Sequence, residues 1–229
     1  MSPIQEFDNL QLRQRMSEGW YGYGRWEAPF WFIGIEPGGK NAEAPMLAWQ
    51  ELGGGELLDC RKHHLHPKFG YTRFQTPPFA LQPTWRRLML LLFAFEKRDI
   101  STERLKQYQA ERWGSRSETG ETCVIEVSPT ASQQQSKNVQ QSLFTIPRIE
   151  HVREMVEKHQ PTFVVLYSSA KRLLPTWERI AGRSFDSDNM TVSGRTVFIV
   201  TPHPVAFRYT DEEWIQFGVR LRNRCQSNS

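Results

Sequence analysis

The pattern that most constrains this chain is a series of four short apolar segments separated by stretches of helical spacing. Each segment is rich in β-branched and aromatic residues and is followed within two residues by serine or proline, which is typical of buried strands. The four segments span residues 30–35, 123–127, 163–167 and 196–200. Strands that alternate with helices predict a parallel sheet covered by helices on both faces.

Helices are expected over residues 42–52, 85–95, 104–113, 146–158, 169–180 and 211–222. The polar start of the chain and the stretch 56–82 show no clear period, and the latter is too long for a plain connector, which indicates a functional role. At 229 residues the chain is long enough for one sizeable core. We therefore expect a single domain, residues 1–229, with a three-layer α/β/α fold around a central, mainly parallel, four-stranded sheet.

The composition limits the kinds of partner and the location that we expect for this protein, but it does not identify a partner. The longest apolar run, residues 88–95, is too short to span a bilayer, and the first residues lack a signal-peptide pattern. We expect a cytoplasmic protein with no membrane contact, and a monomer. The net charge of +4 arises from 29 basic and 25 acidic residues, which permits a polyanionic partner. Three widely spaced cysteines argue against a disulfide framework and predict reduced thiols.

The ends of the first and fourth predicted strands carry the residues best suited to chemistry. Glu36 follows the first strand, and His203 follows the fourth. Because the carboxyl ends of parallel strands meet at one edge of the sheet, where ligands bind in such folds, a carboxylate and an imidazole are expected to share a site.

The two motifs resemble those of the uracil-DNA glycosylase superfamily. Its first motif has the form Gly-x-(acid, Asn or Ala)-Pro-(Tyr or Gly), which is similar to Gly34-Ile35-Glu36-Pro37-Gly38, and its last begins His-Pro, as in His203-Pro204. The resemblance covers residues 30–209, and the run 161–166 followed by Ala170 is similar to the third strand and next helix of that fold.

This resemblance implies a DNA glycosylase that flips a base and hydrolyses its glycosidic bond, leaving an abasic site. Glu36 would stabilise positive charge on the sugar and activate water, while His203 would donate a hydrogen bond to the departing base. Glu36 replaces the commoner Asp, Asn or Ala of the family. Two structural alternatives stay open: Glu36 caps the following helix, and His203 only fills a proline-rich turn.

The remaining site candidates follow from the same resemblance. Phe207 stands where the family inserts an apolar wedge into DNA, although it could instead pack on the last helix. Other candidates would contact the backbone, the base or phosphates: Gly34, Pro37, Gly38, Gly39, Phe74, Phe79, Ser128, Ser169, Lys171 and Arg208. Phe69 and Tyr71 join Phe74 and Phe79 as rings on which a base could stack, with core packing as the alternative.

Two departures from the family affect the expected substrate. Uracil-specific members place an Asn at the end of the second strand, whereas this chain has Glu126, Ser128 and Pro129. Gly38 replaces a tyrosine that blocks substituents at carbon 5 of the ring. The expected substrate is therefore uracil or a bulky 5-modified cytosine of the kind found in phage DNA, in repair or phage defence.

No cofactor or metal is expected. The glycines after the first strand lack the spacings of dinucleotide and P-loop motifs, and Cys60, His63, His64 and His66 match no usual zinc spacing. No lysine stands in a motif position, which disfavours a Schiff base. Two other functions stay open: a nucleic-acid-binding module that keeps the fold without catalysis, and an unrelated hydrolase of free nucleosides.

Overall fold

The computed structural model describes residues 9–35, 43–128 and 146–228. An α/β fold is confirmed, with one mixed sheet of seven strands in the order β3-β1-β4-β2-β5-β7-β6. The prediction of a four-stranded sheet is therefore wrong, because three further strands belong to it. Its four members are present and adjacent: β2 (Phe30–Gly34), β4 (Thr122–Glu126), β5 (Phe163–Tyr167) and β7 (Thr196–Thr201). All pairings among these four are parallel.

The three additional strands flank the parallel centre. They are β1 (Gly22–Gly24), β3 (Leu57–Leu58) and β6 (Met190–Ser193). β1 pairs antiparallel with β4, and β6 pairs antiparallel with β7. These strands are short, and an edge position needs no continuous apolar run, so hydrophobic pattern alone does not predict them.

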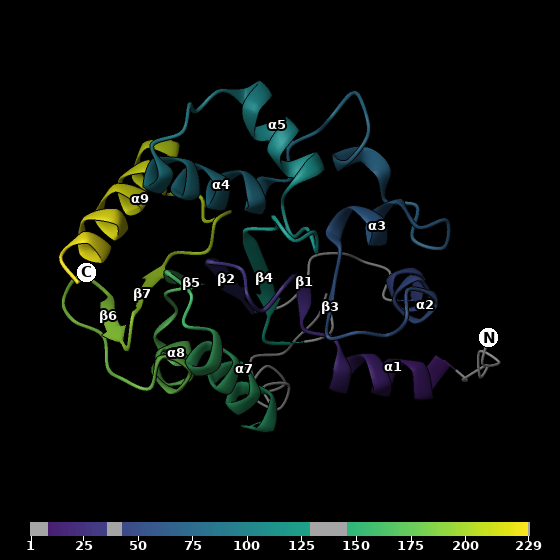
Figure 1. Ribbon diagram of the computed structural model, residues 1–229, viewed down its shortest axis with the longest axis horizontal. Coiled ribbons are helices and arrows are strands. Elements are labelled where there is room, and N and C mark those ends of the chain that lie inside the picture. Colours follow the sequence, from purple (N-terminus) through teal and green to yellow (C-terminus); the bar gives the residue numbers. More distant parts are fainter. Residues whose placement is uncertain (1–8, 36–42, 129–145, 229) are drawn as a thin grey trace.

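Helices cover both faces of the sheet, as expected for a three-layer fold. On one face lie α4 (Pro83–Glu96), α5 (Thr102–Glu111) and α9 (Asp211–Gln226); on the other lie α7 (Ile146–His159) and α8 (Leu174–Ala181). Figure 1 shows these two groups above and below the strands. We call the two sides the α4 face and the α7 face.

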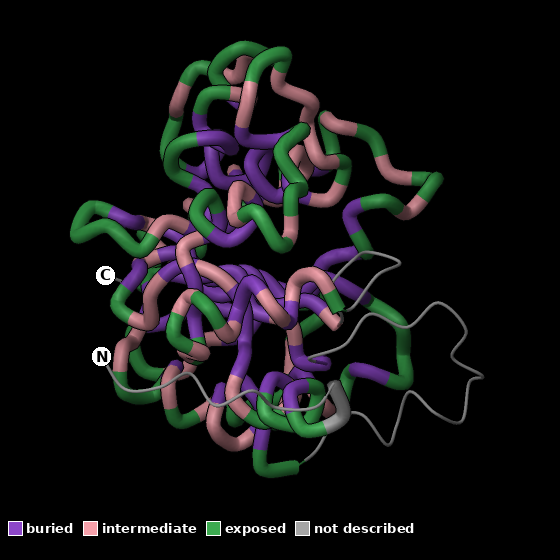
Figure 2. Tube along the Cα trace, turned by 90° about the vertical axis from the view of Figure 1, so that its right-hand side faces the viewer, coloured by how far each residue is buried: buried purple, intermediate pink, exposed green. Residues whose placement is uncertain are grey.

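The two faces alternate along each strand, as the period of two requires. Phe32, Val124 and Val165 belong to the core on the α4 face, whereas Ile33, Ile125 and Leu166 belong to the core on the α7 face. The central strands are buried along their length, with exposed residues in the surrounding loops (Figure 2). The central strands read as continuous apolar runs because both faces are covered.

Four helical segments differ from the expectation. The polar start forms α1 (Asn9–Gly19), and the stretch 56–82, expected to be irregular, contains α3 (Cys60–Leu65) and the 3₁₀ turn η1 (Thr72–Phe74). α2 (Glu43–Glu51) is confirmed, and with α1 it buries a small third cluster that includes Trp49. The helix expected from residue 169 begins as the turn η2 (Lys171–Leu173), because Pro175 suits the first turn of α8.

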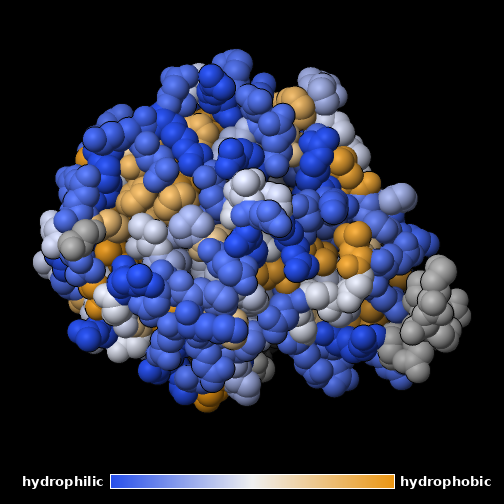
Figure 3. All heavy atoms as spheres, in the orientation of Figure 1, coloured by the Kyte–Doolittle hydropathy of each residue, from blue (hydrophilic) through white to orange (hydrophobic). Residues whose placement is uncertain are grey.

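The surface drawn in Figure 3 is mainly hydrophilic, with small and scattered apolar areas. Among the described residues, no helix combines the length and apolar character needed to cross a membrane.

Candidate functional site

Four residues on the α4 face meet at the carboxyl ends of the parallel strands. Gly34 ends β2 and pairs in register with Glu126, which ends β4. Tyr167 ends β5 in the core of the α4 face, and its ring lies 6.1 Å from the ring of His203, which follows β7. Glu126 and Gly34 each come two residues after a core residue of that face, so Glu126, Gly34 and Tyr167 form one row across the sheet. Thr201 continues this row on β7, and His203 lies two residues beyond it.

The Tyr167 side chain lies over Gly34 and points from β5 toward β4. A Cβ atom at position 34 would overlap the Tyr167 ring, so only glycine lets the ring reach from β5 past β2 toward β4. There the Tyr167 hydroxyl donates a 2.8 Å hydrogen bond to Oε1 of Glu126. Burial and the Glu126 charge raise the pKa of Tyr167 well above its usual value, which keeps the phenol protonated as a donor.

The loop after β7 fixes the tautomer of His203. The backbone N–H of Val205 donates to Nδ1 of His203 at 3.3 Å. A nitrogen that accepts a hydrogen bond carries no proton, so a neutral imidazole at this position has its proton on Nε2. His203 is exposed and therefore offers an N–H donor at the sheet edge.

Residues of α4 and α9 hold this loop. Arg87 donates to the carbonyl oxygens of Pro204 and Ala206. At the start of α9, Thr210 forms a capping box with Glu213. A bidentate ion pair between Arg86 and Asp211 ties the first turn of α9 to the first turn of α4. The segment between His203 and Thr210 is thus anchored at both ends.

The tip of the anchored loop is apolar and exposed. Phe207 is 104% exposed relative to its reference, and Val205 is 54% exposed. The alternative in which Phe207 packs on the last helix is therefore wrong. Arg208 is also exposed, with its guanidinium over the ring of Tyr209. Phe207 thus places a large apolar side chain in water on an anchored loop, an arrangement that suits insertion into a partner.

A buried arginine supports the neighbouring strand end. Arg148 of α7 is 4% exposed, lies over the ring of Tyr21, and donates to four backbone carbonyls. They belong to Val127 at 2.6 Å, Trp20 at 2.6 Å, Glu126 at 2.9 Å and Ser17 at 3.3 Å. Arg148 therefore joins the end of β4 to the end of α1 and fixes the backbone that carries Glu126.

The candidates from the sequence fall in several places. Glu36, Pro37, Gly38 and Gly39 lie outside the described residues. Ser128 is buried, and its N–H donates to the carbonyl of Ile35, which joins the ends of β4 and β2. Ser169 and Lys171 are exposed beyond the end of β5.

The aromatic candidates are divided by burial. Phe74 is buried against Tyr71 and Trp85, so the expected base-stacking role for its ring is replaced by core packing. Phe79 is half-buried, and Tyr71 is exposed and stacked on Phe69. An apolar run around a functional loop does not distinguish core rings from surface rings, which explains the error for Phe74.

Glu126, Tyr167 and Arg148 were not among the candidate site residues. Glu126 ends an apolar run with a charge, and Gly34 ends the neighbouring run without a side chain. A charged residue at one strand end beside a glycine at the next could have predicted that a polar side chain passes over the glycine to contact the charge. Nothing comparable marks Arg148, because its partners are backbone carbonyls distant in sequence.

Two buried histidines of α3, His63 and His64, lie beside Tyr23 of β1. Nε2 of His63 donates to the carbonyl of Pro45 at 2.9 Å, so its Nδ1 accepts from the Tyr23 hydroxyl, also at 2.9 Å. His64 stacks on Trp85. Cys60 is buried and His66 pairs with Glu51. Across the described ranges no cluster of His, Cys, Asp or Glu side chains is arranged to hold a metal ion.

This histidine pair predicts acid sensitivity. Burial lowers the pKa of both His63 and His64 from 6.5 to about 4. The unfolded chain therefore binds protons first as the pH falls, and stability that is complete above pH 6.5 is lost progressively toward pH 4. We expect a loss of about 3 kcal/mol for either histidine across that window.

Urea unfolding at pH 7, 6 and 5 measures this effect. The His64→Gln variant, which cannot titrate there, is expected to show a shallower fall in unfolding free energy than the parent. An equal fall in both proteins would mean that His64 is protonated in the folded state.

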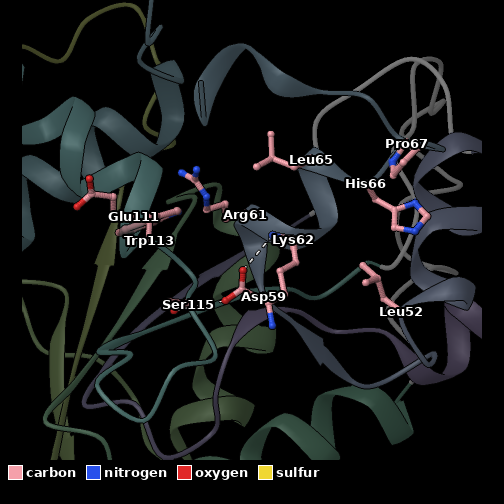
Figure 4. A pocket seen from close by; sticks show the side chains of 10 residues that line it. All are labelled: Leu52, Asp59, Arg61, Lys62, Leu65, His66, Pro67, Glu111, Trp113 and Ser115. Atoms are coloured by element: carbon pink, nitrogen blue, oxygen red, sulfur yellow. Dashed lines mark hydrogen bonds between the residues drawn. The ribbon is translucent and has the colours of Figure 1, made fainter. Parts of the chain in front are cut away.

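Figure 4 shows a hollow whose lining includes none of Gly34, Glu126 and Tyr167. It has a volume of about 540 Å³ and is lined by Asp59, Arg61, Lys62, Glu111 and others from α3 and α5. Its members Trp113 and Ser115 precede β4, and Gly114 donates to Thr122 at the start of that strand. This hollow therefore lies toward the amino end of β4, at the opposite edge of the sheet from Glu126.

Comparison with protein-family models and with curated proteins finds no match to this sequence.

Proposed function

We propose that this protein is a monofunctional DNA glycosylase that hydrolyses the bond between a pyrimidine and its deoxyribose. The observation that carries the proposal is the loop between β7 and α9, which holds an N–H donor at His203 and a fully exposed Phe207 in one anchored segment. Base release needs a donor for the leaving group and a means of taking the base out of the stack.

The chemistry needs only water and side chains. The water oxygen forms a bond to C1′ of the sugar as the bond from C1′ to N1 of the base breaks. Glu36 takes the water proton, and the Nε2–H of His203 donates to the base oxygen on which negative charge collects. The products are the free base, which takes up a proton, and an abasic site. The role of Glu36 rests on the motif in the sequence.

The wedge role of Phe207 leads to a prediction on DNA form. An apolar side chain that fills the space of an extruded base lowers the cost of unstacking in a duplex, and a single strand has little stacking to replace. We expect Phe207→Ala to reduce activity on duplex DNA about tenfold more than on single-stranded DNA.

Val205→Ala is the matched control, because it shortens another exposed apolar side chain of the same loop. The control is expected to leave the duplex preference close to that of the parent. If Phe207→Ala lost the same factor of activity on duplex and on single-stranded DNA, the wedge role of Phe207 would be contradicted.

A panel of DNAs tests the activity itself. Oligonucleotides carrying uracil, 5-hydroxymethylcytosine or glucosylated 5-hydroxymethylcytosine are incubated with the protein, and alkali then cleaves at abasic sites. Cleavage that depends on both Glu36 and His203 supports the glycosylase. Binding to DNA without release of any base would indicate a non-catalytic binding module, and release from free nucleosides alone would indicate a nucleoside hydrolase.

A further inference from the structure

The loop between β7 and α9 carries both His203 and Phe207, and its backbone is joined by local hydrogen bonds. The N–H of Ala206 donates to the carbonyl of His203 at 2.8 Å, and the N–H of Tyr209 donates to the carbonyl of Ala206 at 3.3 Å. The N–H of Val205 donates to the His203 ring. A displacement of the middle of this loop is therefore expected to move the imidazole and the Phe207 ring together.

The helices α4 and α9 form a closely packed frame beside this loop, and they lie side by side in Figure 1. At Gly218 of α9, an added Cβ atom would overlap the carbonyl of Leu91 in α4. Nearer the end of α9, Arg222 donates to the carbonyl of Ala94 at 2.7 Å. Because the ion pair described above also joins the first turns of the two helices, their relative position is fixed along their length.

Arg87 of α4 connects this frame to the middle of the loop. Its Nη1 donates to the carbonyls of both Pro204 and Ala206, which stand in the chain between the imidazole and Phe207. Its Nε lies 3.8 Å from Oδ1 of Asp211, and its side chain is only 21% exposed. A guanidinium holds its N–H donors in fixed directions, so Arg87 fixes the two loop carbonyls relative to α4.

We propose that Arg87 is a positioning residue that places the His203 donor and the Phe207 ring together, and so couples extrusion of the base to its release. This inference rests on the proposed glycosylase function. Arg87 acts through the loop backbone and needs no contact with the substrate. Because a misplacement of about 1 Å can reduce the rate of a reaction about 100-fold, a loop freed from Arg87 is expected to lose activity although its own sequence is unchanged.

Amide hydrogen exchange of the free protein tests the structural part of this inference. We expect Arg87→Met to speed exchange in residues 203–210 at least about tenfold, because a loop without its anchor opens more often. Arg222→Met is the matched control, since it removes another bond from an arginine to a carbonyl between the same two helices, at a distance from the loop. The control is expected to leave exchange in residues 203–210 unchanged.

Single-turnover kinetics test the functional part. We expect Arg87→Met to slow base release about tenfold on single-stranded DNA, where the donor is needed, and about a further tenfold on duplex DNA, where the wedge is needed too. Arg87→Lys is expected to recover part of both losses, because an ammonium keeps the charge without the planar fork. Combined with Phe207→Ala, Arg87→Met is expected to cost less on duplex DNA than the product of the two single effects.

The outcomes separate this inference from the function on which it rests. Base release by the parent, with unchanged exchange and rates in Arg87→Met, would overturn the role of Arg87 and leave the glycosylase in place. Equal losses in Arg87→Met and Arg222→Met would do the same, because helix packing alone would then explain them. Independent effects of Arg87→Met and Phe207→Ala would overturn the coupling. No base release by the parent from any DNA of the panel would overturn the coupling and the glycosylase together.

Discussion

His203→Ala is expected to slow base release by about two to three orders of magnitude, with little change in DNA binding. The tautomer imposed by the Val205 N–H places the ring proton on Nε2, and alanine removes that donor from the developing charge on the leaving base. Removing a donor that acts mainly in the transition state lowers kcat more than it raises KM.

Single-turnover kinetics on a cleavable duplex measure this loss. His66→Ala is a suitable control, because His66 is the half-buried C-cap residue of α3 and pairs with Glu51. An unchanged rate in His203→Ala, with the control also unchanged, would exclude His203 from the chemistry.

Arg148→Met is expected to lower the free energy of unfolding by about 3–5 kcal/mol. Methionine can occupy much of the same volume, but it leaves four backbone carbonyls near Arg148 without their donor. Burial lowers the pKa of Arg148 to about 10, so the group is charged at neutral pH and its carbonyl partners offset the cost of burying that charge.

Urea unfolding at pH 7 measures this difference. Arg153→Met on the same helix is the matched control, because Arg153 is partly exposed and pairs with Glu157 at i,i+4, a pair expected to contribute less than about 1 kcal/mol. Arg148→Lys, which keeps the charge but not the planar fork, is expected to fall between the two. Equal losses at positions 148 and 153 would contradict the structural role of Arg148.

The centre of the fold was predictable because its signal is local. Residues 30–35, 123–127, 163–167 and 196–200 are mostly apolar, and all four segments contribute to the parallel centre of the sheet. β1 and β3 were missed because Gly22–Gly24 and Leu57–Leu58 are too short to show a period. β3 pairs only with β1, and β1 pairs in turn with β4, which lies far along the chain.

The sequence offered candidate site residues only where a motif marks them. His203 and Phe207 were predicted from the His-Pro loop, and both are exposed; their roles stay predictions. The contact of Tyr167 with Gly34 and Glu126 joins three strands, and no spacing within one segment reports it. Phe74 illustrates the reverse error, since a ring beside a functional loop can equally well fill the core.

Direct detection of the free base is the most decisive measurement. Duplex DNA containing 5-hydroxymethylcytosine or its glucosylated form is incubated with the protein, and the small-molecule fraction is analysed by mass spectrometry, with His203→Ala in parallel. A glycosylase is expected to yield a free pyrimidine in amounts equal to the abasic sites, and the variant to yield far less. Strand breaks without a free base, or bound DNA with neither product across the panel, would contradict the proposed function.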